Sequence, residues 1–249
     1  MEKIRKEQLT EQIWLLDDNG DTTGFVIVGK DKAMVVDTMN GSEDVYMIVR
    51  EITDLPLIVV NTHGHPDHIG GNHFFKEIYI NERDVQMIDV FSSPEAKKQL
   101  PKVNLVREGD IFDLGEYTVE VYELPGHTVG SILLLLKEER ILFTGDAINH
   151  HLWMQLEDSL PLEENLKQLE RLSFLKDKAD RILHGHTKNF DDIGLFTLME
   201  NGIRELVHQK DLEITDKDPD YNWFGGVAKQ HKFDNEGSVI CYRPENRLC

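Results

Sequence analysis

The sequence predicts a layered domain of β-sheets and α-helices. Short apolar runs typical of strands alternate with stretches in which leucines recur every three or four residues, as they do on one face of a helix. The 249 residues are 40% hydrophobic and 29% charged, which is typical of a globular chain that buries a core. Internal repeats and linker-like tracts are absent from the sequence, so we expect a single domain over residues 1–249.

Strands are predicted where apolar and β-branched residues form short runs bounded by turn residues. In the first half of the chain these runs are Gln12–Leu16, Gly24–Val28, Ala33–Val36, Leu57–Asn61 and Glu77–Ile80. In the second half they are Tyr117–Tyr122, Ser131–Leu136, Ile141–Thr144, Arg181–Leu183 and Ser238–Tyr242.

Helices are predicted between these strands. Ser42–Thr53 forms the first, with the serine as its N-cap, and Glu82–Leu100 is helical in part with a break near Pro94. The clearest helical pattern starts near Pro161, and Ile193–Gln209 shows a similar one. The leucines that define the former are Leu162, Leu166, Leu169, Leu172 and Leu175.

The charge and cysteine content narrow the partners and the compartment. A formal net charge of -19 argues against binding to nucleic acid, which usually needs a basic patch. The longest apolar run, Ile132–Leu136, is too short to cross a membrane, and the N-terminus lacks the apolar segment of a secretory signal. Two cysteines, Cys241 and Cys249, fit a reducing compartment. We therefore expect a cytoplasmic protein with a small-molecule substrate, and a homo-oligomer is possible.

The segment Asn61–His68 concentrates possible metal ligands directly after a predicted strand. It contains His63, His65, Asp67 and His68, and histidine nitrogen and aspartate oxygen are the usual protein ligands of zinc and similar cations. Because alternate residues of an extended segment share a face, His63 and His65 are expected to point one way. Asp67 and His68 leave the turn in another direction, so one loop can begin two adjacent metal sites.

Three more candidate ligands each follow an apolar run and lie beside a glycine. They are His127 in Leu-Pro-Gly-His-Thr, Asp146 in Phe-Thr-Gly-Asp and His186 in His-Gly-His. Loops that follow strand ends gather at one edge of a sheet, so we expect these residues to converge on the first cluster.

The motifs HGHPDH, GHT, TGD and HGH, in that order, resemble those of the metallo-β-lactamase superfamily over about residues 12–190. The resemblance implies an α+β fold, a four-layer αββα sandwich with metals at one edge of the paired sheets. It also implies two divalent metal ions, zinc in the first place, although manganese and iron suit the same ligands.

The resemblance further implies two ligand sets that share one carboxylate. His63, His65 and His127 would hold the first metal, Asp67, His68 and His186 the second, and Asp146 would bridge them. Asp37, in a Val-Asp-Thr segment, would orient a ligand histidine from behind, and His184 is assigned to the same supporting shell.

Several positions bear on the subfamily. The diiron electron-transfer branch generally has a Glu where this chain has His65, and the β-lactam-hydrolysing branches generally lack a bridging Asp such as Asp146. Glyoxalase II-like thioesterases tend to carry an Arg after the TGD motif, and residues 147–153 lack it. Acyl-homoserine lactonases have a Tyr where this chain has Asn149. The subfamily and the substrate therefore stay open.

The expected activity is metal-dependent hydrolysis of an ester, thioester, lactone or phosphodiester. A hydroxide shared by the two metals would attack, and Asp67 would relay a proton as the catalytic residue. His150, His151 and Trp153 follow Asp146 closely and either line a substrate pocket or pack as loop residues. Other histidines are expected to be structural (His73) or on the surface (His208 and His231).

Two alternatives use the same motifs. A persulfide dioxygenase-like oxidoreductase would hold a single iron and consume oxygen, and a non-catalytic binding protein would bind metal without turnover. The roles of residues 147–160 and 221–226 are left open, the latter as a lid, a dimer contact or an ordinary loop.

Overall fold

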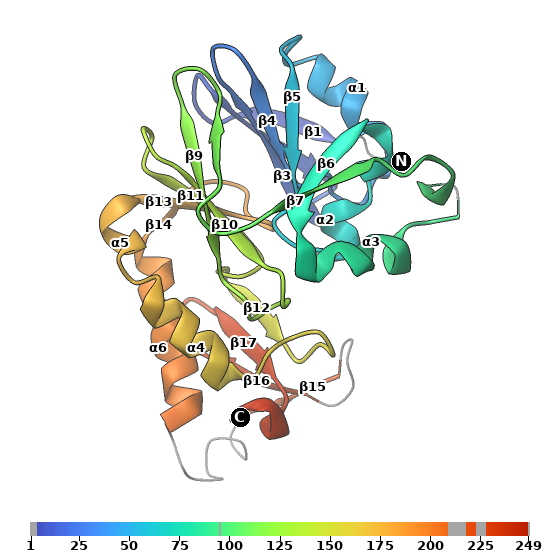
Figure 1. Ribbon diagram of the computed structural model, residues 1–249. Coiled ribbons are helices and arrows are strands. Elements are labelled where there is room, and N and C mark those ends of the chain that lie inside the picture. Colours follow the sequence, from blue (N-terminus) through green and yellow to red (C-terminus); the bar gives the residue numbers. More distant parts are fainter. Residues whose placement is uncertain (1–3, 95, 209–217, 223–227, 249) are drawn as a thin grey trace.

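The computed structural model describes residues 4–94, 96–208, 218–222 and 228–248. The strands of this part of the chain form three β-sheets (Figure 1). The first sheet contains, in spatial order, β1 (Arg5–Gln8), β2 (Ile13–Asp18), β3 (Thr22–Val28), β4 (Ala33–Val36), β5 (Leu57–Val60), β6 (Glu77–Asn81) and β7 (Lys102–Val106). The second contains β14 (Asp191–Asp192), β13 (Arg181–His184), β11 (Ile141–Gly145), β10 (Ile132–Leu136), β9 (Thr118–Glu123) and β8 (Ile111–Asp113). The third contains β12 (His151–Met154), β17 (Val239–Tyr242), β16 (Ala228–Lys232) and β15 (Asp220–Tyr221).

The helices lie outside the paired sheets. The α-helices are α1 (Val45–Arg50), α2 (Pro66–Ile69), α3 (Val85–Phe91), α4 (Leu162–Arg171), α5 (Leu175–Lys178) and α6 (Gly194–His208). Short 3-10 helices are η1 (Asn72–Phe74), η2 (Glu82–Asp84), η3 (Ala96–Gln99) and η4 (Pro244–Asn246). The first three α-helices pack against the first sheet, and α4 and α6 cover the second.

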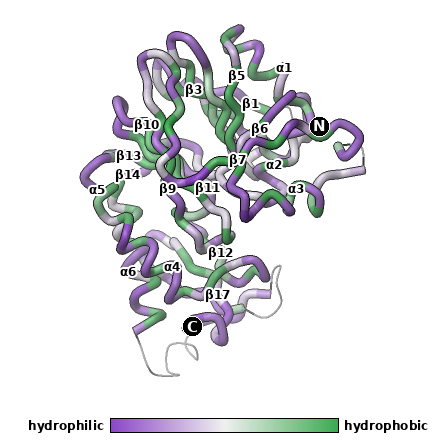
Figure 2. Tube along the Cα trace, in the orientation of Figure 1, coloured by the Kyte–Doolittle hydropathy of each residue, from purple (hydrophilic) through white to green (hydrophobic). Residues whose placement is uncertain are grey.

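The inner core lies between the first two sheets, where Figure 2 shows hydrophobic strands. Phe25 of β3 meets Phe143 of β11 edge to face, with ring centroids 5.3 Å apart. Along β10, Leu134 faces this inner core while Leu133 and Leu135 face the helices on the other side. The strand is buried on both faces, which explains its unbroken apolar sequence. The predicted αββα sandwich is thus confirmed.

The third sheet extends the helix-covered core of the second. Leu152 of β12 and Ile240 of β17 join the same hydrophobic cluster as Leu142 of β11 and Phe196 of α6. The sheet was not predicted as a unit, because β15 and β16 are short and carry few apolar residues. A single domain over residues 1–249 stays a prediction.

The first helix departs from its predicted start. Asp44, not Ser42, caps α1, because its Oδ1 accepts a hydrogen bond from the backbone N–H of Met47 at 3.1 Å. The Ser42 hydroxyl instead donates to Asp18 at 2.8 Å. The serine therefore ties the loop before the helix to β2.

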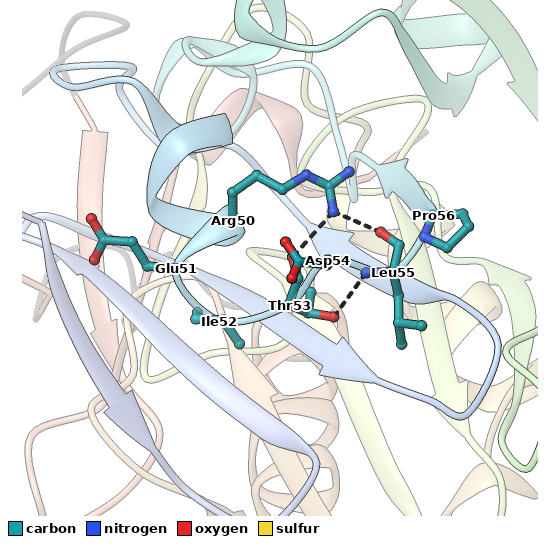
Figure 3. Close-up of a pocket in the computed structure, with 7 residues that line it drawn as sticks. All are labelled: Arg50, Glu51, Ile52, Thr53, Asp54, Leu55 and Pro56. Atoms are coloured by element: carbon teal, nitrogen blue, oxygen red, sulfur yellow. Dashed lines mark hydrogen bonds between the residues drawn. The ribbon is translucent and has the colours of Figure 1, made fainter.

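A pocket lies where the chain leaves α1 and enters β5 (Figure 3). Its lining includes Arg50, whose guanidinium donates to the carbonyl oxygens of Thr53 at 3.1 Å and Leu55 at 2.7 Å. These bonds hold the turn that starts β5, whereas the candidate ligands follow the other end of this strand.

Within the described residues, none of the helices has the length and apolar character needed to cross a membrane.

Candidate metal centre

The loop after β5 is shaped to present ligands on both sides of Gly64. The Gly64 N–H donates to the buried Asp84 carboxylate at 2.8 Å, and a Cβ at this position would lie only 2.6 Å from the Cβ of Met87. Any larger residue would displace α3, so glycine is required between His63 and His65. Pro66 then starts α2 at the first helical position, where its missing N–H is not needed.

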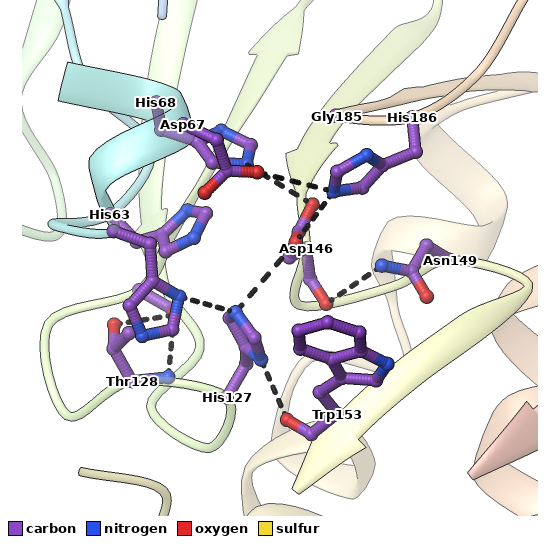
Figure 4. Close-up of polar contacts among 12 residues, drawn as sticks. His63, Asp67, His68, His127, Thr128, Asp146, Asn149, Trp153, Gly185 and His186 are labelled. Atoms are coloured by element: carbon purple, nitrogen blue, oxygen red, sulfur yellow. Dashed lines mark hydrogen bonds and ion pairs between the residues drawn. The ribbon is translucent and has the colours of Figure 1, made fainter. Parts of the chain in front are cut away.

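His63, His65 and His127 form the first cluster, and all three side chains are buried. Figure 4 shows His63 and His127 on the same side of the centre. The Nδ1 of His65 and the Nε2 of His127 are 2.9 Å apart. The Nε2 of His63 is buried and lacks a hydrogen-bond partner. The predicted convergence of His127 on the first loop is therefore found.

Asp67, His68, Asp146 and His186 form the second cluster. The Nε2 of His186 lies 3.0 Å from Asp146 Oδ2, and the Nε2 of His68 lies 3.5 Å from Asp146 Oδ1. Asp67 Oδ2 is 3.5 Å from His68 Nε2. Asp146 Oδ2 also lies 3.8 Å from His127 Nε2, so this carboxylate faces both clusters. Side chains of Asp67 and His186 are 30% and 37% exposed, so the second cluster is the one open to solvent.

Each of the five histidines uses one ring nitrogen to hold its orientation, as ligand histidines usually do. These outer nitrogens contact Thr62 Oγ1 (His63, 3.1 Å), Asp158 Oδ2 (His65, 2.9 Å), Asp37 Oδ2 (His68, 2.8 Å), Trp153 O (His127, 2.7 Å) and Asp21 O (His186, 2.6 Å). A neutral imidazole that donates through one nitrogen has a lone pair on the other. All five inward nitrogens can therefore serve as ligand atoms.

Asp37 also connects two loops behind the clusters. Its carboxylate accepts hydrogen bonds from the Thr62 N–H and hydroxyl, both at 2.7 Å, besides that from His68. The Thr62 hydroxyl proton is used in this bond, so the Nδ1–H of His63 is the donor to Thr62. One buried carboxylate thus orients a histidine of each cluster, the supporting position predicted for Asp37.

The electrostatics of the two clusters differ. Burial, followed by the neighbouring His65, lowers the pKa of His127 to about 4, and burial together with His68 lowers the pKa of His63. In the second cluster Asp146 raises the pKa of His186 to about 9. Burial acts against ionisation of Asp146, but His186 and His68 hold its pKa well below the usual range. His63 and His127 of the first cluster are therefore neutral. The second cluster pairs the Asp146 carboxylate with a protonated His186, whose inward proton a bound cation can replace.

Divalent cations fit both clusters. The inward nitrogens of His65 and His127 are 2.9 Å apart, and in the neutral rings each would carry a lone pair. Two facing lone pairs repel each other, and a cation bound to both nitrogens would remove this repulsion. Three buried atoms in the centre lack hydrogen-bond partners: His63 Nε2, His68 Nε2 and Asp146 Oδ1. Buried polar atoms are rarely left unsatisfied, so these three fit metal coordination.

The remaining predicted residues lie around this centre. The exposed ring of His151 has its centroid 6.1 Å from that of Trp153, and both rings pack near Tyr221. His150 and His184 instead contact Asp191. His73 bonds to the Gly70 carbonyl, as a structural histidine would. Of the open segment 221–226, residues 223–226 lie outside the described part of the chain.

His231 is not on the surface as predicted. It is buried at 7% exposure between Asp218 and Glu205, with ring nitrogens 3.1 and 3.4 Å from their carboxylates. Both partners come from outside its own strand, β16, so no local pattern indicates this burial.

Sequence reasoning missed several residues that shape the centre. Asp158 holds His65, and Asp84 accepts from Gly64 N–H, Gly130 N–H and the Thr128 hydroxyl at 2.7–2.9 Å. Asn149 donates to the Asp146 carbonyl at 3.3 Å and accepts from the His151 N–H at 2.8 Å, which orders the turn after the shared carboxylate.

Residues 17–186 match the family model of the metallo-beta-lactamase superfamily. This match covers more than half of the chain and contains both clusters, so the chain belongs to that superfamily.

The chain is similar to the acyl-coenzyme A thioesterase MBLAC2 of Bos taurus, with 30% identity over 59% of this chain and 62% of the relative. It is also similar to the hydroxyacylglutathione hydrolase GloC of Haemophilus influenzae, with 31% identity over 47% of this chain and 61% of that protein. The chain thus spans about three fifths of the length of these relatives. Among solved structures, a metallo-beta-lactamase from Pontibacter korlensis matches 81% of this chain and 99% of its own, with a TM-score of 0.65 and 21% identity, which shows the shared fold.

Proposed function

We propose that this chain is a metal-dependent hydrolase of ester-type bonds with two adjacent cation subsites. His63, His65 and His127 would form the first subsite, Asp67, His68 and His186 the second, and Asp146 would serve both. The observation that carries this proposal is the separation of 2.9 Å between His65 Nδ1 and His127 Nε2, two nitrogens whose rings are each held from the outer side by another contact. Zinc is the first cation to test, followed by manganese and iron.

The protein's own groups would position the substrate and handle protons. Two divalent cations, when bound there, would supply a water acidic enough to react near neutral pH and would polarise a carbonyl or phosphoryl oxygen. Asp67 lies at the exposed side of the second subsite, 3.5 Å from His68 Nε2. Its carboxylate can accept a proton from an attacking water and return it to the leaving group. A serine or cysteine nucleophile is not required, and the buried Cys241 remains protonated at neutral pH, since burial raises its pKa to about 12.

Thioesters are the first substrate class to test. The relatives named above as an acyl-coenzyme A thioesterase and a hydroxyacylglutathione hydrolase both act on acyl compounds, by their names. The Trp153 carbonyl binds His127, which places this residue directly beside the first subsite, as Figure 4 shows. Trp153, His151 and Tyr221 offer partly exposed rings for the organic portion of such a substrate.

The test joins metal analysis to a substrate panel. Purified protein is assayed for zinc, manganese and iron and then offered ester, thioester, lactone and phosphodiester substrates, alongside Asp67→Asn, His127→Ala and the control His73→Gln. We expect two cations per chain and hydrolysis that Asp67→Asn lowers by at least about 100-fold. Because Asp67 is also a proposed ligand, Asp67→Asn should bind the second cation more weakly while the first cation stays in place. His127→Ala should lose the first cation, and His73→Gln should retain both cations and activity.

Either of two results would contradict this proposal and favour another function. One iron per chain with oxygen consumption would favour a persulfide dioxygenase-like reaction, and two cations without turnover on any of the four classes would favour a binding protein. Trp153→Ala with raised KM and unchanged metal content would support the substrate surface. A cytoplasmic location is part of the proposal and is consistent with the free, buried thiol of Cys241.

A further inference from the structure

A third cluster of possible ligands lies next to the second subsite. It consists of His150, His184 and Asp191, whose candidate ligand atoms all lie within 4.8 Å of one another. The Nε2 atoms of His150 and His184 are 3.0 and 3.3 Å from the two oxygens of Asp191. Two histidines and a carboxylate can hold a cation, but they can equally form a hydrogen-bonded chain, and the outer ring nitrogens distinguish these arrangements.

The backbone of His186 determines which nitrogen of His184 carries the proton. The His186 N–H donates to His184 Nδ1 at 3.2 Å, so this nitrogen presents a lone pair. A neutral imidazole with a lone pair on Nδ1 has its proton on Nε2, and that N–H faces Asp191. A cation on His184 Nε2 would force the proton onto Nδ1, opposite the His186 N–H. The cluster is therefore arranged as a hydrogen-bonded chain.

The chain of contacts continues into the third sheet. His150 Nε2 is 3.0 Å from Asp191 Oδ1, and His150 Nδ1 is 2.7 Å from the hydroxyl oxygen of Ser238, the residue before β17. Asp191 itself starts β14 and pairs with Ile182 of β13, the strand that leads to His186. The Asp191 carboxylate thus connects the loop that carries His186 to the third sheet. Strand β17 of that sheet lies outside residues 17–186, the part of the chain that matches the family model.

The charge of Asp191 suits this role. Burial acts to raise the pKa of this carboxyl, but hydrogen bonds from His150 and His184 lower it overall. The carboxylate is consequently ionised at neutral pH and accepts from both histidines at once. Aspartate at this position can do so because its two oxygens separate the two donors, whereas an asparagine has only one acceptor oxygen.

We propose that Asp191 is a positioning residue that acts through His184 on the backbone of His186, and that it thereby sets how tightly the second subsite holds its cation. This inference rests on the proposed ligands of the metal centre. The His186 side chain is held from one side by the Asp21 carbonyl at 2.6 Å. Its backbone N–H is held by His184 Nδ1, so loss of Asp191 would remove the support behind His184 and loosen the backbone that carries the His186 ring.

The experiment titrates Zn²⁺ and Co²⁺ into the full chain after removal of metal with a chelator. Wild type is compared with Asp191→Asn, His184→Gln and the control Glu236→Gln. Glu236 is an exposed carboxylate that raises the pKa of His150 through its charge, so its replacement removes nearby negative charge without breaking the hydrogen-bonded chain. His184→Gln can still donate toward Asp191 through its Nε2, but it has a carbon where His184 Nδ1 accepts from the His186 N–H.

The affinity of the second equivalent should fall about 10-fold in Asp191→Asn and in His184→Gln, with a changed Co²⁺ spectrum for that equivalent. The first equivalent should bind as in wild type, which also shows that the variants fold, and Glu236→Gln should match wild type. Equal affinities in wild type and Asp191→Asn would overturn the inference, as would a third cation in wild type that Asp191→Asn loses. A wild type that binds no cation would overturn the proposed function itself.

Discussion

Asp158 Oδ2 accepts a hydrogen bond from His65 Nε2 at 2.9 Å, although the two residues are 93 positions apart. This bond fixes the ring so that Nδ1 faces His127. Burial acts to raise the pKa of Asp158, but the bond from His65 lowers it, so the carboxylate is an ionised acceptor. The neighbouring Ser159 hydroxyl donates to the His127 carbonyl at 2.9 Å. The segment before α4 therefore supports two ligands of the first subsite.

Asp158→Ala is expected to weaken cation binding at the first subsite by about 10- to 100-fold, because the His65 ring loses its partner. Asp158→Asn retains an acceptor oxygen and should have a smaller effect. The measurement is competition of each variant with a chromophoric chelator. Glu157→Gln removes the same charge from an exposed neighbour and serves as the control. If Asp158→Ala and Glu157→Gln bind the first cation alike, the supporting role of Asp158 is wrong.

Asp84 joins the two loops that carry the first cluster. The buried carboxylate accepts from Gly64 N–H at 2.8 Å, Gly130 N–H at 2.9 Å and the Thr128 hydroxyl at 2.7 Å. Asp84→Ala would leave these donors buried without an acceptor, so we expect the free energy of unfolding to fall by about 3 kcal/mol or more. Urea denaturation with fixed metal content measures this change.

Asp89→Asn is the matched control for Asp84 because Asp89 lies nearby on α3 with an 85% exposed side chain. Its contact with Lys97 is a surface ion pair of 3.7 Å, and such pairs contribute about 1 kcal/mol at most. A loss in Asp84→Ala no larger than that in Asp89→Asn would contradict the role assigned to Asp84.

Gly185→Ala is expected to remove the second cation. A Cβ at this position would lie 2.4 Å from His68 Cε1 and 2.6 Å from Asp146 Oδ1, and neither group can retreat from the crowded centre. Elemental analysis should show about one cation per chain. Gly109→Ala, where nothing lies within 4 Å but φ is +89°, tests a glycine replacement away from the site. It should lower stability without changing metal content, and two tightly held cations in Gly185→Ala would refute the expected clash.

The strands that the sequence predicted are those buried by apolar neighbours. β10 and β11 carry unbroken apolar residues because both of their faces are covered. β1, with the sequence RKEQ, is exposed at a sheet edge and exists because it pairs with β2, so its own residues carry no hydrophobic signal. β16 pairs Gln230 with Cys241 in the third sheet and is equally polar. Pairing partners, which a local pattern does not contain, determine such strands.

The residues of the candidate site also fall into those that a local sequence pattern predicts and those that depend on distant partners. The convergence of the seven proposed ligands could be predicted because short motifs combine histidine or aspartate with glycine after an apolar run. Asp158 and Asp84 belong to no motif, since each acts on a loop from a different part of the chain. His184 was predicted as a supporting residue from its position, but its partner Asp191 became evident only from the side-chain contacts. Residues that orient the ligands are harder to predict, because their role depends on where they lie in the folded chain and not on a short sequence motif.

Cys241 provides a prediction on pH dependence that is independent of metal. Its thiol is buried, with Sγ 3.3 Å from His151 Nε2, and burial raises its pKa from 9.0 to about 12. Between these values the unfolded chain loses the thiol proton and the folded chain keeps it. The unfolded state thus binds fewer protons, so stability should fall as pH rises above about 9. In Cys241→Val this contribution is absent, and the decline from pH 8 to pH 11 should be shallower.

The same thiol should resist alkylation in the folded protein, since the thiolate is the reactive form. In a Cys249→Ser background, iodoacetamide at pH 8 should modify Cys241 slowly in the native protein and rapidly in urea, as mass spectrometry would show. Protection of the thiol by burial and protection by the nearby His151 are separated by His151→Ala, which leaves Cys241 at its place in β17. Rapid modification of the native Cys249→Ser protein would show that the Cys241 thiol ionises near neutral pH, contrary to the effect of its burial.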